Sequence, residues 1–395
     1  MGSQAVREHA SFQRAEARLL TRDLIEDPKD YVMAIERYSC SVVSIIGWGR
    51  RIERKDDYVV EQACAVMNQA VDIQVPGAYW AETIPELAWL PPWIYALPTI
   101  LRMGGEASRK YFYALTAEGA AAKAPNFAKY LIAAQKETGL GDGDIAGLTA
   151  NLIGGGVDTT SSTMITFILA CCAFPEAQRK AQEEIDRVIG QDRSPTLDDE
   201  PNLPYCAALL KEVFRWRSVT ILGGLPHAPI KDDEFRGYHF PAGINITGNL
   251  WAIHRNPRDF PEPDVFKPER FLEGNRLPYP NERGHNAFGW GRRQCSGQPL
   301  AEQGLAMSII RFLWAFNIEA GTDGNVRNSQ NSQLTCRVAL WSRIFSRTRM
   351  EKIPVLSPSR PSSHRGPREL GNLFSKRQNK HGKICEFTTA KHIYI

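Results

Sequence analysis

Near its C-terminal end the chain reads Phe288-Gly-Trp-Gly291-Arg-Arg293-Gln-Cys295-Ser-Gly297. The cysteine lies in a loop rich in glycine and arginine, and the apolar run at 298–313 predicts a helix directly after it. A thiolate near a helix N-terminus is favoured by the helix dipole and by free backbone N–H groups. The glycines let the backbone turn beneath a flat ligand. Arg293 can neutralise an acidic group on such a ligand.

A single thiolate held in this way suits an axial ligand to haem iron. The spacing F-x-x-G-x-R-x-C-x-G resembles the haem-binding loop of the cytochromes P450, and the resemblance is closest to the fungal, secondary-metabolism type. It implies haem b as the cofactor and Cys295 as the residue that binds the metal. It also implies cofactor contacts from four other loop residues, which are Phe288, Gly291, Arg293 and Gly297. The alternative is a buried, inert cysteine in a glycine-rich turn, a common setting for single cysteines.

The longest apolar helical stretch, 142–174, carries Gly154-Gly-Gly-Val-Asp158-Thr-Thr160. Three glycines inside a helix cost roughly 1 kcal/mol each relative to alanine, so they need a reason. They predict either the close approach of a large flat ligand or a break in the helix, where a hydroxyl or a water inserts. The segment resembles the P450 central-helix motif, which implies that Asp158 and Thr159 are catalytic and relay protons to dioxygen. A kinked helix without a catalytic role is the alternative.

Charged residues form a second predicted group. Glu212 and Arg215 have the i, i+3 spacing of a helix, so their side chains can pair, although most such pairs are solvated surface pairs. The later segment Phe266-Lys-Pro-Glu-Arg270-Phe271 resembles the second arginine segment of the family. The resemblance implies a buried, structural network of Glu212, Arg215 and Arg270 beneath the haem loop.

Helical periodicity dominates the chain, including 7–26, 107–123 and 175–190, whereas only 230–246 has the alternation of a small sheet. The predicted fold class is therefore mainly α with a small β-sheet. The resemblance implies a cytochrome P450 fold that is incomplete, with the early helices and first strands missing, and a partial P450 domain over 1–320. His227, just before the small sheet, matches a family position that contacts a haem propionate; a satisfied loop histidine is the alternative.

Composition restricts the remaining possibilities. The chain has 395 residues, 43% of them hydrophobic, and its eight cysteines show no paired spacing, which indicates a reducing compartment. The sequence contains no run of eighteen apolar residues, so no transmembrane helix is expected.

The C-terminal segment has a different charge from the rest of the chain. Residues 341–395 hold twelve Lys and Arg against three Asp and Glu, a net charge of +9, and we expect 321–395 to be an atypical, disordered basic tail. The proline-broken aromatic segment 84–98 either touches a membrane surface, lines the mouth of an apolar channel or packs as an ordinary loop.

The resemblance implies an enzyme, a haem-thiolate monooxygenase that oxidises a lipophilic small molecule in secondary-metabolite biosynthesis. Its expected partners are NADPH-cytochrome P450 reductase, O2 and the substrate, and no nucleic acid is expected. The full-length family lies on the cytosolic face of the endoplasmic reticulum membrane, and this chain is expected to lack the anchor. One alternative is a truncated, non-catalytic remnant. Another is a haem-thiolate isomerase or dehydratase that uses no O2, against which the pair Asp158-Thr159 argues.

Overall fold

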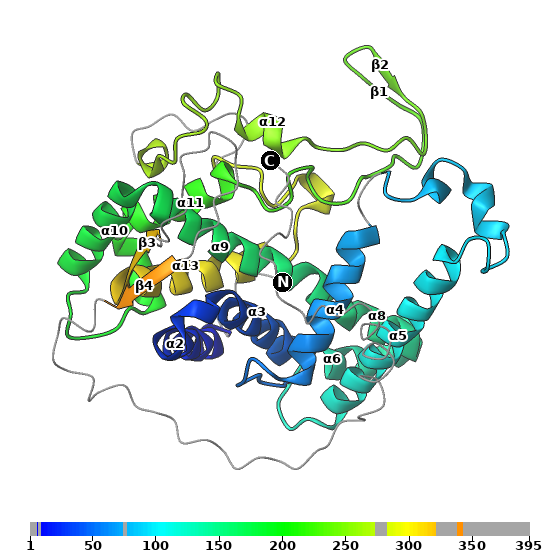
Figure 1. Cartoon of the computed structure of the whole chain (residues 1–395), viewed down its shortest axis with the longest axis horizontal. Helices are drawn as coiled ribbons and strands as arrows, with labels where there is room; N and C mark the ends of the chain where they lie inside the picture. Colours follow the sequence, from blue (N-terminus) through cyan, green and yellow to red (C-terminus); the bar gives the residue numbers. More distant parts are fainter. Residues whose placement is uncertain (1–5, 7–8, 74–76, 273–282, 321–337, 343–395) are drawn as a thin grey trace.

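The computed structural model describes residues 6, 9–73, 77–272, 283–320 and 338–342, and it is mainly helical (Figure 1). The predicted fold class, mainly α with a small β component, is confirmed. The helices of the described residues are α2 (Ala10–Glu26), α3 (Tyr31–Trp48), α4 (Tyr58–Ile73), α5 (Leu97–Ala121), α6 (Phe127–Ala133), α7 (Gln135–Thr138), α8 (Asp142–Gly156), α9 (Asp158–Ala173), α10 (Pro175–Val188), α11 (Pro204–Trp216), α12 (Leu250–His254) and α13 (Gln298–Ala315). Short 3-10 turns lie at Pro28–Asp30, Trp80–Glu82, Pro85–Trp89, Leu197–Asn202, Pro268–Phe271 and Gly291–Arg293.

Two groups of buried side chains form the core. The larger one joins α2, α3, α9, α10, α11 and α13, and its fully buried members include Leu20, Phe167 and Phe312. The second joins α3, α4, α5, α6 and α8 around Trp48 and Leu115. Helices α8 and α9 run one after the other through the middle of the molecule (Figure 1), so the same apolar stretch contributes to both groups.

The stretch Asp142–Ala173 is also long and apolar enough to cross a membrane, contrary to the expectation that no such helix would be found. Half of its most apolar window is buried inside the fold. Because the core helix of a soluble protein meets the same criteria, this finding is only a weak indication of a membrane span. Its position between the two core groups explains the apolar composition without a membrane.

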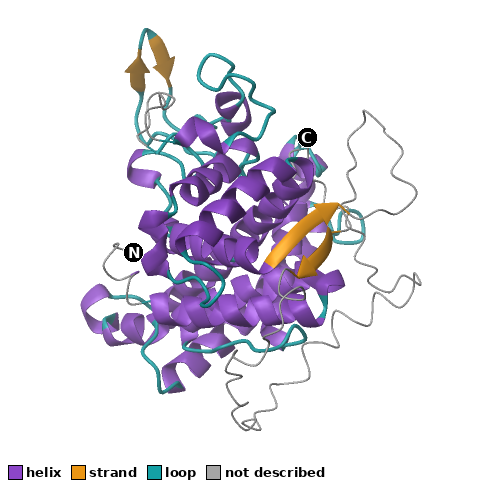
Figure 2. Cartoon of the chain, turned by 90° about the vertical axis from the view of Figure 1, so that its left-hand side faces the viewer, coloured by secondary structure: helices purple, strands orange, loops and turns teal. Residues whose placement is uncertain are grey.

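The strands form two small antiparallel sheets. In one, β1 (Asp233–Phe235) pairs with β2 (Tyr238–Phe240), with Asp233 opposite Phe240, and this hairpin stands away from the helices (Figures 1 and 2). In the other, β3 (Phe316–Ala320) pairs with β4 (Val338–Ser342). The strand β4 lies within the segment 321–395, for which the sequence predicts an atypical, disordered basic tail. The rest of 321–395 lies outside the described residues.

Candidate functional site

The loop that carries Cys295 is closed by its own backbone. The N–H of Cys295 donates to the carbonyl of Phe288 at 2.9 Å, and the N–H of Gly289 donates to the carbonyl of Asn286 at 2.9 Å. Gly289 and Gly291 have φ values of +75° and +55°, a left-handed conformation that favours glycine. Helix α13 begins at Gln298, three residues after Cys295. The loop therefore presents the cysteine just before a helix N-terminus.

The thiol of Cys295 is free and exposed, so the alternative of a buried, inert cysteine does not describe it. The other cysteines of the described residues are buried or half-buried. Burial raises the pKa of the Cys171 and Cys206 thiols well above the ordinary range, which makes them unreactive. Within the described part of the chain, Cys295 is the exposed cysteine and therefore the one best placed to bind a ligand.

The other predicted residues of the loop have different surroundings. The ring of Phe288 packs edge-on against Phe214 of α11, with 5.0 Å between ring centroids, and so ties the loop to the core. Arg293 is exposed, and its guanidinium has no hydrogen-bond or ion-pair partner among the residues that the structure describes. Gly297 is the residue before α13, and a Cβ there would lie 3.8 Å from the sulfur of Cys295.

His227 lies on a neighbouring segment that is held against the loop. Its backbone exchanges two hydrogen bonds with Ile246, of 3.0 and 2.7 Å, and its exposed side chain has no partner among the described residues. The indole ring of Trp290 lies on Gly248, where a Cβ would be 2.5 Å from the ring. Only glycine at 248 allows this contact, which fixes the base of the His227 segment beside the loop.

The glycines of the central helix have two separate explanations. A Cβ at Gly156 would be 2.5 Å from the Cγ1 of Val43, so Gly156 permits α8 to pack closely on α3. A Cβ at Gly154 or Gly155 would meet no other atom within 4 Å, so open space adjoins the helix there. The close packing of Gly156 on α3 is an explanation that the sequence analysis did not include, whereas the open space at Gly154 and Gly155 is compatible with the predicted approach of a flat ligand.

The helix is interrupted next to the predicted catalytic pair. Val157 separates α8 from α9 and has φ −81° and ψ −69°. The hydroxyl of Thr159 donates to the carbonyl of Gly155 at 2.7 Å, and the hydroxyl of Thr163 repeats this pattern one turn later, to the carbonyl of Thr159, at 2.7 Å. Asp158 is half-buried, and its charge is one of several causes that raise the pKa of the buried Cys40 thiol on α3, after burial itself.

The structure brings Glu212, Arg215 and Arg270 together. Glu212 and Arg215 are fully buried and form two hydrogen bonds of 2.7 Å, and Arg270 donates its Nε–H to Glu212 at 3.1 Å. The remaining guanidinium N–H groups donate to backbone carbonyls of the segment 254–265, which are those of His254, Pro261, Glu262, Pro263 and Val265. The network therefore fixes the backbone of the segment that precedes the cysteine loop.

Sequence reasoning missed His254, the residue that joins this network to the loop. The carbonyl of His254 accepts from Arg215 at 3.0 Å, and its ring Nε2 accepts from the backbone N–H of Asn286 at 2.9 Å. Burial, and then the charges of Arg215 and Arg255, lower the pKa of His254 to about 4. A lone histidine in a five-residue helix has no spacing that would mark it in the sequence.

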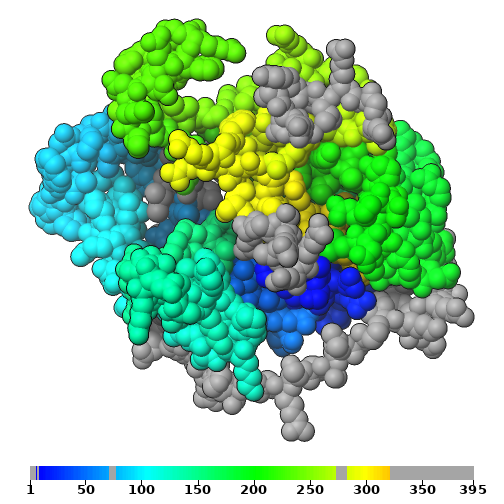
Figure 3. Space-filling view, turned by 180° about the vertical axis from the view of Figure 1, so that it is seen from behind, coloured from blue at the N-terminus to red at the C-terminus, as the bar shows by residue number. Residues whose placement is uncertain are grey.

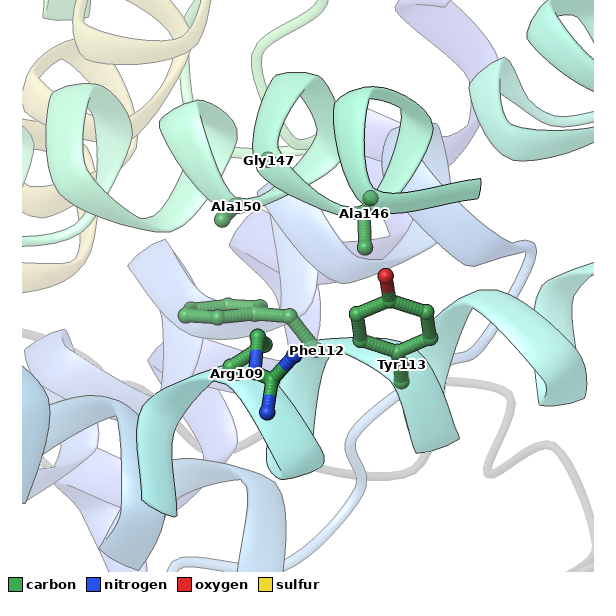
Figure 4. Close-up of a pocket in the computed structure, with 7 residues that line it drawn as sticks. Arg109, Phe112, Tyr113, Ala146, Gly147 and Ala150 are labelled. Carbon is green, nitrogen blue, oxygen red and sulfur yellow. The ribbon is translucent and has the colours of Figure 1, made fainter. Parts of the chain in front are cut away.

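A cavity of about 150 Å³ lies between α5 and α8 (Figure 4). Phe112 and Tyr113 of α5 face Ala146 and Ala150 of α8 across it. It contains none of the predicted site residues, and it is smaller than the roughly 300–1,000 Å³ typical of small-molecule sites. The surface is hollowed elsewhere, between the cyan segment that follows residue 77 and the yellow segment around the Cys295 loop (Figure 3).

The donor set around Cys295 fits a haem. One exposed soft thiol can serve as a single axial ligand. Arg293 and His227 offer an unpaired guanidinium and imidazole, which suit the two carboxylates at the edge of a porphyrin. A Cβ at Gly154 or Gly155 would meet no atom within 4 Å, so the central helix leaves open space at these positions. No group of three or more His, Cys, Asp or Glu side chains that could hold a bare metal ion is found in the described ranges.

Comparison with known proteins points to the same chemistry. A family model described as cytochrome P450 matches residues 25–340. The chain is 36% identical over 337 residues to cytochrome P450 monooxygenase 58 of Postia placenta, a match that covers 81% of this chain and 63% of the relative. It is 34% identical over 330 residues to cytochrome P450 monooxygenase virE of Hypocrea virens, covering 80% and 60%. It is 32% identical over 330 residues to cytochrome P450 monooxygenase polD of Polytolypa hystricis, covering 80% and 64%. The chain spans about three-fifths of the length of the curated relatives it matches.

Proposed function

The chain belongs to the cytochrome P450 family, and we propose that it acts as a haem-thiolate monooxygenase on a lipophilic small molecule. The observation that carries the proposal is the free, exposed thiol of Cys295 on a closed glycine turn before α13. Haem, when bound, supplies the redox chemistry that activates dioxygen, with electrons from NADPH-cytochrome P450 reductase. The three relatives named above are themselves monooxygenases by name.

Each of the predicted loop residues would make a different contact with the cofactor. Cys295 would be the axial ligand, and Arg293 and His227 would pair with the propionates, since both are exposed and without partners among the described residues. Gly291 and Gly297 would let the backbone approach the ring. Phe288, which packs against Phe214, would hold the loop in place next to the ring. Glu212, Arg215 and Arg270 would act structurally, by holding the segment that precedes the loop.

Asp158 and Thr159 would deliver protons into the space beside Gly154 and Gly155. The hydroxyl hydrogen of Thr159 is directed to the carbonyl of Gly155, so the lone pairs of its oxygen remain available to accept from a water. Asp158, which is half-buried, would exchange protons between that water and solvent. This task is specific to a reaction that protonates dioxygen, which favours a monooxygenase over an isomerase or a dehydratase.

Exposed tryptophans in the segment between α4 and α5 support the proposal of a lipophilic substrate and of a peripheral membrane contact. Trp89 and Trp93 expose 83% and 84% of their surfaces, and Trp80 exposes 73%. Amphipathic indole rings favour the boundary between lipid headgroups and hydrocarbon. We place the protein at the cytosolic face of the endoplasmic reticulum membrane, in secondary-metabolite biosynthesis of the fungal type. The substrate would then enter from the lipid phase.

Changing Cys295 to Ala is expected to abolish the red-shifted Soret band that a thiolate-ligated haem gives when reduced and treated with carbon monoxide. The physical reason is the loss of the only exposed sulfur donor among the described cysteines. The matched control is Cys172→Ala on α9, which should keep the band. A band that persists in Cys295→Ala would refute the ligand assignment, and its absence from the unmodified chain would favour the non-catalytic alternative.

Changing Thr159 to Ala is expected to uncouple electron consumption from product formation. The variant loses the hydroxyl that holds water for proton delivery, so product per NADPH should fall on the order of tenfold while peroxide rises. The assay uses the reductase and a lipophilic substrate chosen by its spectral change on binding. Thr163→Ala is the control, because it removes the same hydroxyl-to-carbonyl bond one turn away. If the two variants formed the same amount of product per NADPH, the motif would be a structural kink without a catalytic role.

A further inference from the structure

We propose that His254 is a positioning residue, whose neutral imidazole in a single tautomer holds the Cys295 loop on the Glu212–Arg215–Arg270 network. The proposal concerns how the loop is kept in place. It rests on the proposed function only for its spectroscopic test, because the hydrogen bonds that carry it do not involve the cofactor.

The hydrogen-bond partners of His254 determine its tautomer. The backbone N–H of Asn286 can only donate, so the Nε2 atom that receives it at 2.9 Å carries no proton. The Nδ1 atom lies 2.8 Å from the hydroxyl of Ser218, which already donates its own hydrogen to the carbonyl of Phe214 at 2.6 Å. Nδ1 therefore carries the proton and donates to Ser218. Each polar atom of the ring has one partner in the correct role.

The two sides of His254 face two different parts of the site. On its backbone side, the carbonyl accepts from Arg215, which is itself paired with Glu212. On its ring side, Nε2 holds Asn286, nine residues before Cys295. Asn286 then organises the turn, because its carbonyl accepts from Gly289 and its side-chain oxygen accepts from the indole of Trp290 at 3.0 Å. Movement of Asn286 would thus be passed to the turn that presents the thiol.

The surroundings keep the ring neutral. His254 exposes only 1% of its surface, and the edge of the Phe260 ring packs against it with centroids 5.9 Å apart. The charged groups that face it are Arg215 and Arg255, and the second buried histidine, His285, is near enough to affect it electrostatically. A protonated imidazole could no longer accept from Asn286. A neutral ring is therefore both the favoured form and the one that the loop requires.

The test compares two variants of His254. His254→Leu removes the acceptor and the donor, whereas His254→Gln keeps an amide oxygen near the position of Nε2 and an N–H group beside it. Hydrogen exchange of the amides of Asn286 and Gly289 reports the loop directly and needs no cofactor. We expect exchange in the Leu variant to be about tenfold faster, the effect of losing one buried hydrogen bond, and the Gln variant to restore most of it.

A matched control separates positioning from general destabilisation. Leu20→Ala removes a fully buried core side chain on α2 and should accelerate exchange broadly, without selecting the loop. Unchanged exchange at Asn286 in His254→Leu, or failure of Gln to rescue, would overturn the proposal. If the Leu variant does not fold, nitrogen chemical shifts of His254 in the unmodified chain decide the matter. The Nδ1-protonated tautomer supports the proposal, and the Nε2-protonated tautomer contradicts it.

The holoprotein gives a second readout. In His254→Leu the share of reduced, carbon monoxide-treated haem with the red-shifted, thiolate-ligated band should fall severalfold, and His254→Gln should recover it. A red-shifted share in His254→Leu equal to that of the unmodified protein would overturn the proposal. If the unmodified chain itself lacks the band, the proposed function fails, and hydrogen exchange still tests the positioning role by itself.

Discussion

Replacing Glu212 with Gln is expected to lower the free energy of unfolding by about 3–5 kcal/mol, because it leaves the buried charge of Arg215 without a partner. Both side chains are completely buried, and Glu212 also accepts from Arg270 at 3.1 Å and from the backbone N–H of Lys267 at 2.8 Å. A neutral amide can keep some of these hydrogen bonds but not the compensating charge. Urea unfolding of the two proteins, followed by circular dichroism, measures the difference.

The control for this prediction is an exposed ion pair on a helix, with i, i+4 rather than i, i+3 spacing. Glu183 pairs with Arg179 of α10, and the two side chains are 61% and 54% exposed. Glu183→Gln should change the free energy of unfolding by no more than about 0.5 kcal/mol, because exposed pairs are screened by water. If Glu212→Gln costs as little as Glu183→Gln, the Glu212 network is not the buried structural element that its geometry indicates.

The sequence predicted the members of the charge network but not its connection to the loop. Helical spacing places Glu212 and Arg215 on one face, which is local information, and the segment around Arg270 was found through its resemblance to a known pattern. His254 reaches Asn286 across 32 positions of the chain. A contact between a single histidine and a backbone N–H depends on the folded path of both segments, so no spacing rule identifies it in advance.

The central helix is a second case in which the sequence did not determine the structural role of each residue. The glycine run predicted close packing of a ligand or a break in the helix, and the sequence could not distinguish between these explanations. The structure assigns Gly156 to the contact with Val43 and leaves open space at Gly154 and Gly155. Whether Asp158 and Thr159 are catalytic stays a prediction that Thr159→Ala tests.

The predicted start of α5 differs from the observed one, because proline occurs both where helices begin and where they end. The periodicity predicts a helix over 107–123, and the segment 84–98 before it is broken by prolines. In the structure α5 begins at Leu97, with the proline in its first turn, where its missing N–H is not needed. The periodicity of 107–121 agrees with the structure, and the earlier ten residues were not predicted because a proline can mark the start of a helix as well as its end.

Lowering the pH from 7 to 5 is expected to destabilise the protein through its two buried histidines. Burial lowers the pKa of His254 to about 4 and that of His285 to about 3, against 6.5 for the unperturbed group. Between pH 6.5 and 4 the unfolded chain therefore binds more protons than the folded one, so stability is fully present above 6.5 and is lost as the pH falls. The two groups together should cost about 4 kcal/mol between pH 7 and 5.

A substitution at His285 isolates half of this effect. His285 packs against Phe214 and Phe288 with tilted rings, whose centroids lie 5.1 and 6.1 Å away, and His285→Gln replaces it with a side chain that does not titrate. The variant is less stable at pH 7, but its further loss between pH 7 and 5 should be about 2 kcal/mol smaller than in the unmodified protein. His239→Gln, at an exposed position of β2, should leave that loss unchanged. Equal losses in all three proteins would mean that the histidines beneath the cysteine loop are not held neutral, because only a depressed pKa couples them to folding in this pH range.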